Sequence, residues 1–419
     1  MKILFLSNLY PPNIVGGYER LCFEVANGLA ESGHHVTVLT SDYGGKVQDF
    51  PNQIVERSLK LFATEGDIYQ PFSCSPEQRA AMNVNNADML TRVVEQFAPN
   101  VIFVWNLYFL DPSLLNAIQQ IKRSNVFLLT DNWLIAFLNA SFIQDYFSQR
   151  VYSHHSKPEP QYLLNAKQKA KSWIEKRTKP SFLMRGRAIF ASRFMCNLYS
   201  EANFHFDGKT IIYHGVNLAE HSEKDFAIRR QFVVKGEVRL LVAGRIVEIK
   251  GVHTVIEALP SIIRALPEAR VILTILGDDH DQPYMERLHA RIAEMEVADM
   301  VNFVKPVVEE DLFNLFQNYD IYLFPSLYEP FSLTLIHALA AGIPTIASNV
   351  GGNPEIVHHM QTGMLFPKGN AQKLAEAVIR LVLNVNLRQS ISEKARKMAS
   401  HYTFGKMLGE VEKYLEKTR

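Results

Sequence analysis

The 419-residue sequence is poor in cysteine, and it lacks long apolar runs and low-complexity segments. Its three cysteines, Cys22, Cys74 and Cys196, are too few and too far apart to suggest a disulfide framework or a zinc site. No apolar run reaches ~18 residues, so we expect no membrane-spanning helix. Because the first residues resemble a strand rather than a signal peptide, we expect a reduced, cytoplasmic compartment.

The sequence also has no excess of charge of either sign. It contains 44 Lys and Arg against 43 Asp and Glu, and the net charge of +1 gives no general attraction to nucleic acid. No carboxylate cluster with metal-ligand spacing is present, so we expect neither a metal site nor a bound cofactor. With 47% hydrophobic and 21% charged residues, the composition predicts a globular enzyme with two domains of about 200 residues each.

The first half of the sequence has the pattern of an α/β domain. Residues 2–7 predict a buried strand, 18–31 an amphipathic helix and 35–40 a second strand, which together favour a doubly wound parallel sheet. Further strands are expected at 101–104, 126–129 and 188–191. The loop after the first strand contains Gly16 and Gly17 but no G-x-G-x-x-G fingerprint, which argues against a nicotinamide-dependent enzyme.

The most informative stretch is 325–355, PSLYEPFSLTLIHALAAGIPTIASNVGGNPE. It predicts two helices, starting near Phe331 and Pro354, that follow neighbouring strands at 319–324 and 345–347. Free backbone N–H groups at such helix starts can bind an anion. Glu329 would repel phosphate and is therefore expected to face neutral groups such as sugar hydroxyls. The alternative is that Glu329 only caps the helix and the glycines only make a turn.

Two cations surround the loop after the strand predicted at 238–244. Arg245 follows Gly244, and Lys250 precedes Gly251. Such a pair suits a diphosphate, because arginine offers a planar fork of donors and lysine a point charge. An ion pair with Glu248 is the alternative, although it would leave the glycines unexplained.

Together these segments resemble the signature of retaining nucleotide-sugar glycosyltransferases of the GT-B fold, glycosyltransferase family four (glycosyl transferases group 1). The family pattern contains Glu-Pro-Phe-Gly, a second Glu eight positions after the first, Ala-x-Ala-x-Gly-x-Pro and Gly-Gly-x-x-Glu. The corresponding residues here are 329–332 (EPFS), 337–344 (HALAAGIP) and 351–355 (GGNPE). The second Glu of the pattern is His337 in this chain. Residues 16–20 (GGYER) resemble the family's N-terminal glycine loop.

The resemblance implies an α/β GT-B architecture, with two Rossmann-like doubly wound domains facing across a cleft. The implied boundaries are 1–206 for an acceptor-side domain, 207–218 for a linker and 219–401 for a nucleotide-sugar-binding domain. Residues 402–419 would form a helix that packs back on the first domain.

The resemblance also implies the site. The catalytic residues would be Glu329, Arg245, Lys250 and Asp131. The donor would be bound by Gly16, Gly17, Gly244, Arg245, Lys250, Glu329, Phe331, Ser332, Leu333 and His337. Asp131 matches the aspartate of a His-Asp pair found in many relatives, while Thr130 replaces the histidine. A helix cap is the other interpretation of Asp131.

The function implied is transfer of a sugar, with retention, from a nucleotide diphosphate-sugar to a glycan, a lipid-linked saccharide or a small molecule. No metal would be needed, because fixed cations can replace a metal ion in stabilising a departing diphosphate. The alternative is a non-catalytic sugar-nucleotide-binding GT-B protein, as the residues Thr130 and His337 would allow. The presence of Arg245 and Lys250 argues against that alternative.

A basic segment at 157–187 contains nine Lys and Arg against two Glu, with Trp173 and Phe182 among the apolar residues between them. One interpretation is a solvated helix, the usual fate of a run of charge. The other is a surface through which the enzyme touches anionic lipid at the inner face of the membrane.

Overall fold

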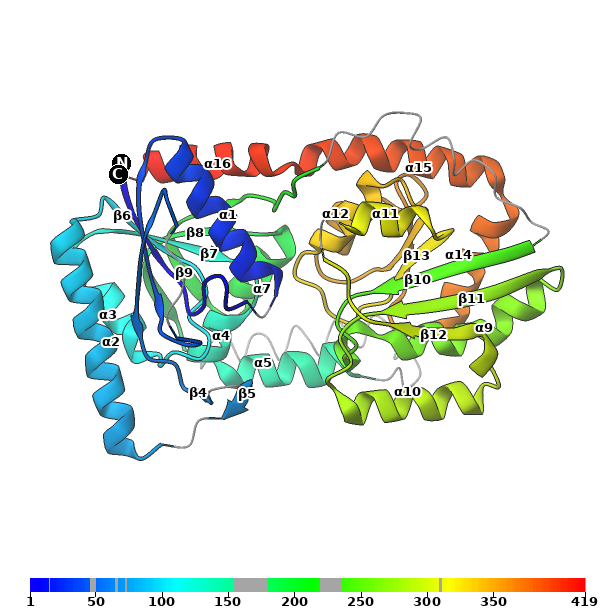
Figure 1. Ribbon diagram of the computed structural model, residues 1–419, viewed down its shortest axis with the longest axis horizontal. Helices are drawn as coiled ribbons and strands as arrows, with labels where there is room; N and C mark the ends of the chain where they lie inside the picture. Colours follow the sequence, from blue (N-terminus) through cyan, green and yellow to red (C-terminus); the bar gives the residue numbers. More distant parts are fainter. Residues whose placement is uncertain are drawn as a thin grey trace, which may run out of the picture. The chain divides into compact units, whose positions relative to one another are not determined.

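The computed structural model describes residues 1–14, 16–45, 50–64, 67–71, 74–153, 180–218, 236–308 and 311–418. The chain divides into two compact units (Figure 1). Unit 1 contains residues 1–212 and 408–419, and unit 2 contains residues 213–407. The passage from one unit to the other lies within the segment 207–218 in which the sequence places the linker.

Unit 1 is built on a parallel seven-stranded sheet with the order β3-β2-β1-β6-β7-β8-β9. Its strands are β1 (Lys2–Leu6), β2 (His35–Ser41), β3 (Ile54–Leu59), β6 (Val101–Val104), β7 (Ser124–Leu129), β8 (Phe182–Phe190) and β9 (Phe204–Ile211). A separate antiparallel pair is formed by β4 (Ala63–Thr64) and β5 (Asp67–Pro71). The central strands are apolar and buried, as expected for a parallel sheet covered on both faces.

The expected linker is wrong in its first part, because residues up to Ile211 belong to β9. This strand alternates buried or half-buried with exposed residues from Phe204 to Lys209. It lies at the edge of the sheet, where one face meets water. Such a strand carries polar residues at every second position, so it lacks the apolar run by which β1 or β6 is recognised.

Helices connect and cover the strands of unit 1. They are α1 (Gly17–Glu31), α2 (Pro76–Phe97), α3 (Ser113–Gln120), α4 (Trp133–Leu138), α5 (Ala140–Tyr146), the π-helix η1 (Phe147–Val151), α7 (Arg193–Glu201) and, at the end of the chain, α16 (Phe404–Glu416). Most of the basic segment 157–187 lies outside the described residues; its last part, including Arg185 and Arg187, lies in β8.

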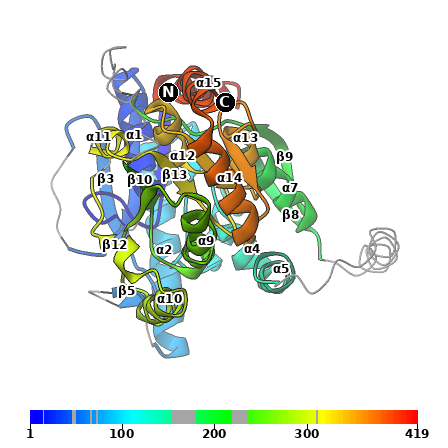
Figure 2. The same ribbon diagram turned by 90° about the vertical axis from the view of Figure 1, so that its right-hand side faces the viewer.

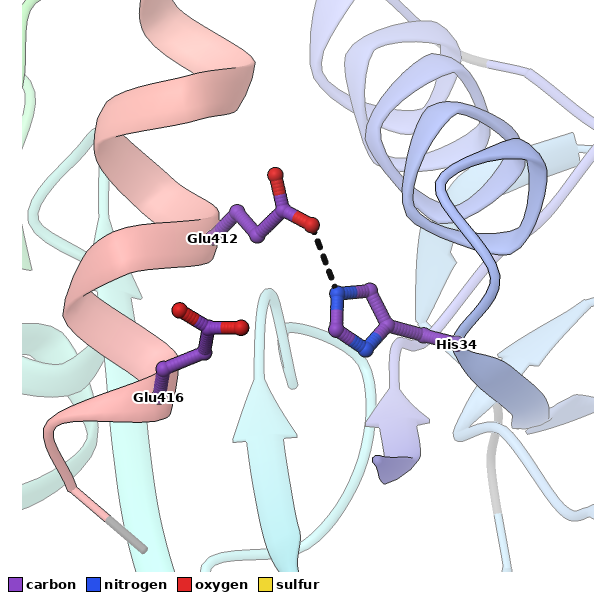
Figure 3. Close-up of side chains that lie close together, drawn as sticks. All are labelled: His34, Glu412 and Glu416. Carbon is purple, nitrogen blue, oxygen red and sulfur yellow. Dashed lines mark hydrogen bonds and ion pairs between the residues drawn. The ribbon is translucent and has the colours of Figure 1, made fainter.

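The last helix packs beside the first in unit 1 (Figure 1). A Cβ placed on Gly28 of α1 would lie 2.6 Å from the Leu408 side chain, so glycine permits a close approach of α16. One turn further along α16, His34 Nε2 lies 2.8 Å from Glu412 Oε1, and Glu416 lies on the turn after that (Figure 3). The end of the chain is therefore part of the first unit.

Unit 2 contains a six-stranded parallel sheet with the order β12-β11-β10-β13-β14-β15. Its strands are β10 (Gly236–Ala243), β11 (Ala269–Leu276), β12 (Val301–Val304), β13 (Ile321–Phe324), β14 (Thr345–Ser348) and β15 (Met364–Phe366). As predicted, the strand before Pro325 and the strand at 345–347 are neighbours.

The helices of unit 2 cover this sheet, and α9 lies beside α14 (Figure 2). They are the 3-10 turn η3 (Glu248–Lys250), α9 (Val252–Ala265), α10 (Gln282–Glu294), the 3-10 turn η4 (Ala298–Met300), α11 (Leu312–Gln317), α12 (Leu333–Ala340), α13 (Asn353–Ile356), α14 (Ala371–Leu383), α15 (Val385–Ala399) and the 3-10 turn η6 (Ser400–Tyr402). Nowhere in the described ranges is a helix both long and apolar enough to cross a bilayer.

Candidate active site

The residues predicted for the donor in unit 2 follow the carboxyl ends of adjacent strands. The chain leaves β10 towards β11 on one side and later returns to β13 on the other, so the strand order reverses between β10 and β13. In open α/β sheets, ligands bind outside the carboxyl ends of the strands at such a point. Arg245 follows β10 and Glu329 follows β13, which puts both on loops at this edge.

An ion pair joins two of the predicted residues. Lys250 Nζ donates a hydrogen bond of 2.6 Å to Glu329 Oε2, and Ser326 Oγ lies 3.4 Å from the same oxygen. The Glu329 residue is only 6% exposed, whereas the Lys250 side chain is 24% exposed. The expected alternative pairing of the cations with Glu248 is wrong, because Glu248 instead accepts from Arg287 of α10 at 2.8 Å.

Backbone packing explains the glycine that follows Lys250. Gly251 has φ of +68°, and a Cβ there would lie 2.2 Å from the carbonyl oxygen of Pro325. Only glycine adopts this conformation freely and lets the two loops touch. The ammonium group of Lys250 also lies 5.6 Å from the centre of the Phe324 ring, a cation–π distance.

The glycine pair after β14 supports Glu329 from behind. Gly351 has φ of +55°, and a Cβ there would lie 1.8 Å from the carbonyl oxygen of Glu329. The next residue, Gly352, donates its N–H to that same oxygen at 2.9 Å. The two glycines therefore form more than a turn, since they hold the backbone of Glu329 against the loop that opens α13.

The helix after Glu329 begins later than predicted. Ser332 is the N-cap, its hydroxyl accepts the Leu335 N–H at 3.2 Å, and α12 starts at Leu333. Pro330 therefore lies outside the helix. A serine that can satisfy a free N–H group at the helix start decides the boundary here, in preference to the proline. His337 lies half-buried on this short helix.

Aromatic residues hold Phe331, and the sequence prediction missed most of them. The Tyr213 ring stacks on Phe331 with a centroid distance of 5.6 Å, and the His214 ring meets it edge-on at the same distance. Tyr213 Oη also donates to Glu355 Oε2 at 3.0 Å. Burial lowers the pKa of His214 to about 3, so this imidazole stays neutral. Neither Tyr213 nor His214 belongs to the motifs quoted above, so no sequence pattern pointed to this contact.

Arg245 is the exposed member of the cation pair. Within the described part of the chain, its side chain makes no hydrogen bond or ion pair, so it can approach an anion without losing a partner. Gly244 before it has φ of +144°, and its carbonyl oxygen would lie 1.9 Å from a Cβ on Gly277 after β11. The glycines thus let the loops after β10 and β11 lie against each other.

The remaining predicted residues lie in unit 1, also at the carboxyl edge of a sheet. Gly16 caps α1, and its N–H donates to Glu19 Oε2 at 3.0 Å. Gly17 is the first residue of α1, and both glycines are exposed.

Asp131 follows β7 in the same unit and accepts the Trp133 N–H at 2.9 Å as α4 begins. The N-cap of α4 is Asn132, so Asp131 supports the turn before the helix rather than capping it. Burial raises the pKa of Asp131 to about 6, and the negative charge of Glu19 adds to the shift. A carboxyl group that titrates near neutral pH can exchange a proton with a substrate.

One group with the spacing of metal ligands occurs among the described residues. His34, Glu412 and Glu416 bring ligand atoms within 4.8 Å of one another (Figure 3). His34 immediately precedes β2, so the group lies at the amino edge of the unit 1 sheet, whereas Gly16 and Asp131 lie at the carboxyl edge. It therefore lies beside α16, at the other edge of the sheet from the candidate site residues of unit 1.

Comparison with known proteins follows the same division of the chain. The family model "Glycosyltransferase Family 4" matches residues 15–220, and "Glycosyl transferases group 1" matches residues 223–398. An uncharacterised glycosyltransferase of Methanocaldococcus jannaschii is 25% identical, over 95% of this chain and 93% of that protein.

Solved structures share the fold. Sucrose-phosphate synthase from Thermosynechococcus elongatus has a TM-score of 0.71 at 19% identity, over 99% of this chain and 98% of that one. Anabaena HepE, solved with UDP-glucose, has a TM-score of 0.64 at 20% identity, over all of both chains. The expected GT-B fold is confirmed. The chain is an enzyme of glycosyltransferase family four, the glycosyl transferases group 1.

Proposed function

We propose that the enzyme transfers a sugar from a nucleotide diphosphate-sugar, with retention of anomeric configuration and without a metal ion, and that unit 2 binds this donor. The observation that carries the proposal is the Lys250–Glu329 pair. It joins a cation and a carboxylate beside the place where the strand order of the unit 2 sheet reverses, between β10 and β13. The UDP-glucose bound by HepE is the kind of donor expected.

The charges favour a diphosphate over a neutral leaving group. Breaking the bond between the sugar C1 and the phosphate oxygen leaves negative charge on the diphosphate. Arg245 has a free side chain among the described residues, and Lys250 keeps two further N–H donors beside the one given to Glu329. Positive groups fixed in this way stabilise the departing diphosphate, and that is the task a metal ion would otherwise perform.

Glu329 is proposed to orient the donor sugar. It is nearly buried and held by its backbone, so its carboxylate can accept hydrogen bonds from sugar hydroxyls in a fixed direction. Its negative charge is balanced by Lys250, which keeps it from repelling the phosphates. His337 would lie near the nucleotide and replace one carboxylate contact to the ribose.

The acceptor is proposed to be bound mainly by unit 1. Its hydroxyl oxygen forms the new bond to C1, and its proton goes either to the leaving phosphate or to Asp131. Because the pKa of Asp131 is raised to about 6, this carboxylate is a better base than an ordinary aspartate. Gly16 and Gly17 leave the start of α1 open for a close approach by the acceptor or the donor phosphates.

Release of UDP or GDP from a panel of nucleotide sugars tests the proposal, with and without a chelator. Lys250→Ala and Arg245→Ala should each lower turnover by roughly 10²-fold, the usual cost of one preorganised charge contact. Lys373→Ala is the matched control, since Lys373 pairs with Glu376 on the surface of α14 in the same unit. Turnover that survives both substitutions, or that disappears with the chelator, would contradict the proposed site or its metal independence.

A further inference from the structure

A second candidate site lies at the opposite edge of the unit 1 sheet from Asp131. It is a cavity of about 530 Å³, within the range of small-molecule pockets. The cavity surrounds the start of β7, whereas Asp131 follows the end of that strand. Six strand residues separate the two edges by roughly 20 Å.

Positive charge dominates the wall of this cavity. Lys122 and Arg123 come from the loop before β7, and Arg185 and Arg187 come from β8; among the described residues that line the cavity, Asp207 alone carries a carboxylate. All four cations are exposed. Across the described residues, the side chains of Lys122, Arg123 and Arg185 form no hydrogen bond or ion pair, so their charge is available to a ligand.

An irregularity in β8 brings the two arginines to the cavity. The pairing of β8 with β9 shifts register between Met184 and Arg187, and Gly186 between them has φ of +130°. A Cβ on Gly186 would lie 2.6 Å from the carbonyl oxygen of Asn125, so β8 can approach β7 this closely only at a glycine. Bulges of this kind redirect side chains and occur often beside binding sites.

Neighbouring side chains fix the irregular strand in place. Gln119 bonds both backbone groups of Arg185, accepting its N–H at 2.6 Å and donating to its carbonyl oxygen at 3.2 Å. Asp207 Oδ2 accepts the Gly186 N–H at 2.7 Å. The Asp207 carboxylate is therefore bonded to the backbone, and these bonds hold the irregular part of β8 in place.

Asn125, one of the residues that line the cavity, carries a buried acceptor without a partner among the described residues. Asn125 is 5% exposed, and its Nδ2 donates to the Ile118 carbonyl oxygen at 3.2 Å. Its Oδ1 is buried and has no hydrogen-bond partner in the described structure. A buried acceptor left unpaired is costly, and a ligand hydroxyl would satisfy it once a small displacement of the covering atoms opened Oδ1 to the cavity.

We propose that this cavity binds a phosphorylated polyol, with the phosphate held by Arg123 and Arg185 and a hydroxyl donated to Asn125 Oδ1. The same chemistry is offered by a soluble sugar or glycerol phosphate and by the glycerol phosphate headgroup of an anionic lipid. The site is separate from the proposed donor site, so it would bind its ligand in addition to the two substrates.

Calorimetric titration of the full chain with sn-glycerol 3-phosphate tests the proposal. The Lys250→Ala background is used, because the proposed diphosphate site could also bind the probe. Arg123→Gln and Arg185→Gln should each weaken binding by about tenfold, as expected for loss of a charge-assisted contact. Arg92→Gln on α2 removes an exposed arginine of the same unit away from the cavity and should leave binding within about twofold.

Two further arms make the test decisive. Inorganic phosphate should bind several-fold more weakly than glycerol phosphate, and equal affinities would overturn the role of Asn125. Flotation with phosphatidylglycerol–phosphatidylcholine vesicles, against pure phosphatidylcholine, separates the two sources of the ligand. Binding to the anionic vesicles that depends on Arg123 and Arg185 would assign the lipid headgroup. Binding of glycerol phosphate and of vesicles that is unaffected by both substitutions would overturn the proposal.

Discussion

At the scale of single residues, the central feature is a contact between groups that are 79 positions apart, Lys250 and Glu329. Sequence motifs marked each residue, one as a phosphate cation and the other as a sugar contact. Neither motif showed that the two side chains bond to each other. The pair makes the charge of Glu329 tolerable in a nearly buried position and fixes the direction of both groups before the donor arrives.

His337 is a second feature of this scale, because the family pattern has a carboxylate at that position. A carboxylate accepts from two ribose hydroxyls, whereas neutral imidazole has one donor and one acceptor nitrogen. We expect His337→Glu to tighten donor binding by about fivefold, corresponding to ~1 kcal/mol for the regained hydrogen bond. Donor affinity is measured by titration of the product nucleotide. Unchanged affinity with a lower melting temperature would show that His337 serves only the packing of α12.

The carboxyl group of Asp131 gives a prediction about pH. Its pKa is raised from 3.8 to about 6 by burial, so between these values the folded protein keeps a proton that the unfolded chain has lost. Stability contributed by this group therefore falls as pH rises from about 4 to about 6 and is constant above. Asp131→Asn should remove that loss, at most about 3 kcal/mol.

The measurement is the melting temperature from pH 4 to pH 8 for the wild type and Asp131→Asn. The variant should be the more stable protein above pH 6, and the difference should shrink towards pH 4. Asparagine can still accept the Trp133 N–H, so the start of α4 is preserved. A difference that is independent of pH would contradict the raised pKa.

At the scale of elements, Gly351 links the loop after β14 to Glu329. Gly351→Ala adds a Cβ that would lie 1.8 Å from the Glu329 carbonyl oxygen, in a backbone conformation of φ +55°. We expect the Glu329 loop to move, with turnover reduced by 10²-fold or more, because misplacement by about 1 Å can have this effect.

The matched control is Gly369→Ala. Gly369 has a similar φ of +65°, yet a Cβ there meets nothing within 4 Å. This variant should show only the cost of the left-handed conformation, roughly 1–2 kcal/mol of stability, with normal turnover. Equal turnover in the two variants would show that the contact with Glu329 has no part in catalysis.

Elements also show what the sequence could and could not predict. The strands β10, β13 and β14 were recognised because the last four residues of β10 and all of β13 and β14 are buried, and those of β10 and β13 form apolar runs. The edge strands β3 and β9 were not, because neither is a continuous apolar run: β3 contains Glu56 and Arg57, and β9 contains Asp207 and Lys209 at exposed positions. The start of α12 was misplaced, since local rules favoured Pro330 and the hydrogen bond of Ser332 decided otherwise.

The candidate site divides in the same way. Glycines and cations were identified by their spacing in motifs that follow predicted strands, and the structure shows the close approaches that require Gly251, Gly351 and Gly277. Tyr213 and His214 were not assigned a role, because their contact with Phe331 joins segments more than 100 residues apart. Tertiary contacts of this kind leave no local pattern in a single sequence.

At the scale of the whole molecule, the chain begins and ends in unit 1. We expect Val411→Ala, on α16, to lower the stability of unit 1 by about 2 kcal/mol, because Val411 is fully buried. Amide hydrogen exchange in the variant, compared with the wild type, should speed up in β1 and β6 of unit 1 more than in β10 and β13 of unit 2. Glu410→Ala, at an exposed position of the same helix, is the control. Equal effects on both sheets would show that the two units open together.

The return of the chain to unit 1 also sets an order of events during synthesis on the ribosome. The strands of unit 1 are made first, yet α16, which covers part of them, is made only after the rest of unit 2. During that interval the surface around Gly28 that later contacts Leu408 is open to the solvent. The nascent enzyme therefore presents an incomplete first domain while its second domain is already able to fold. A chaperone that binds apolar surface would find its target at the surface around Gly28 until α16 has been made and has packed there.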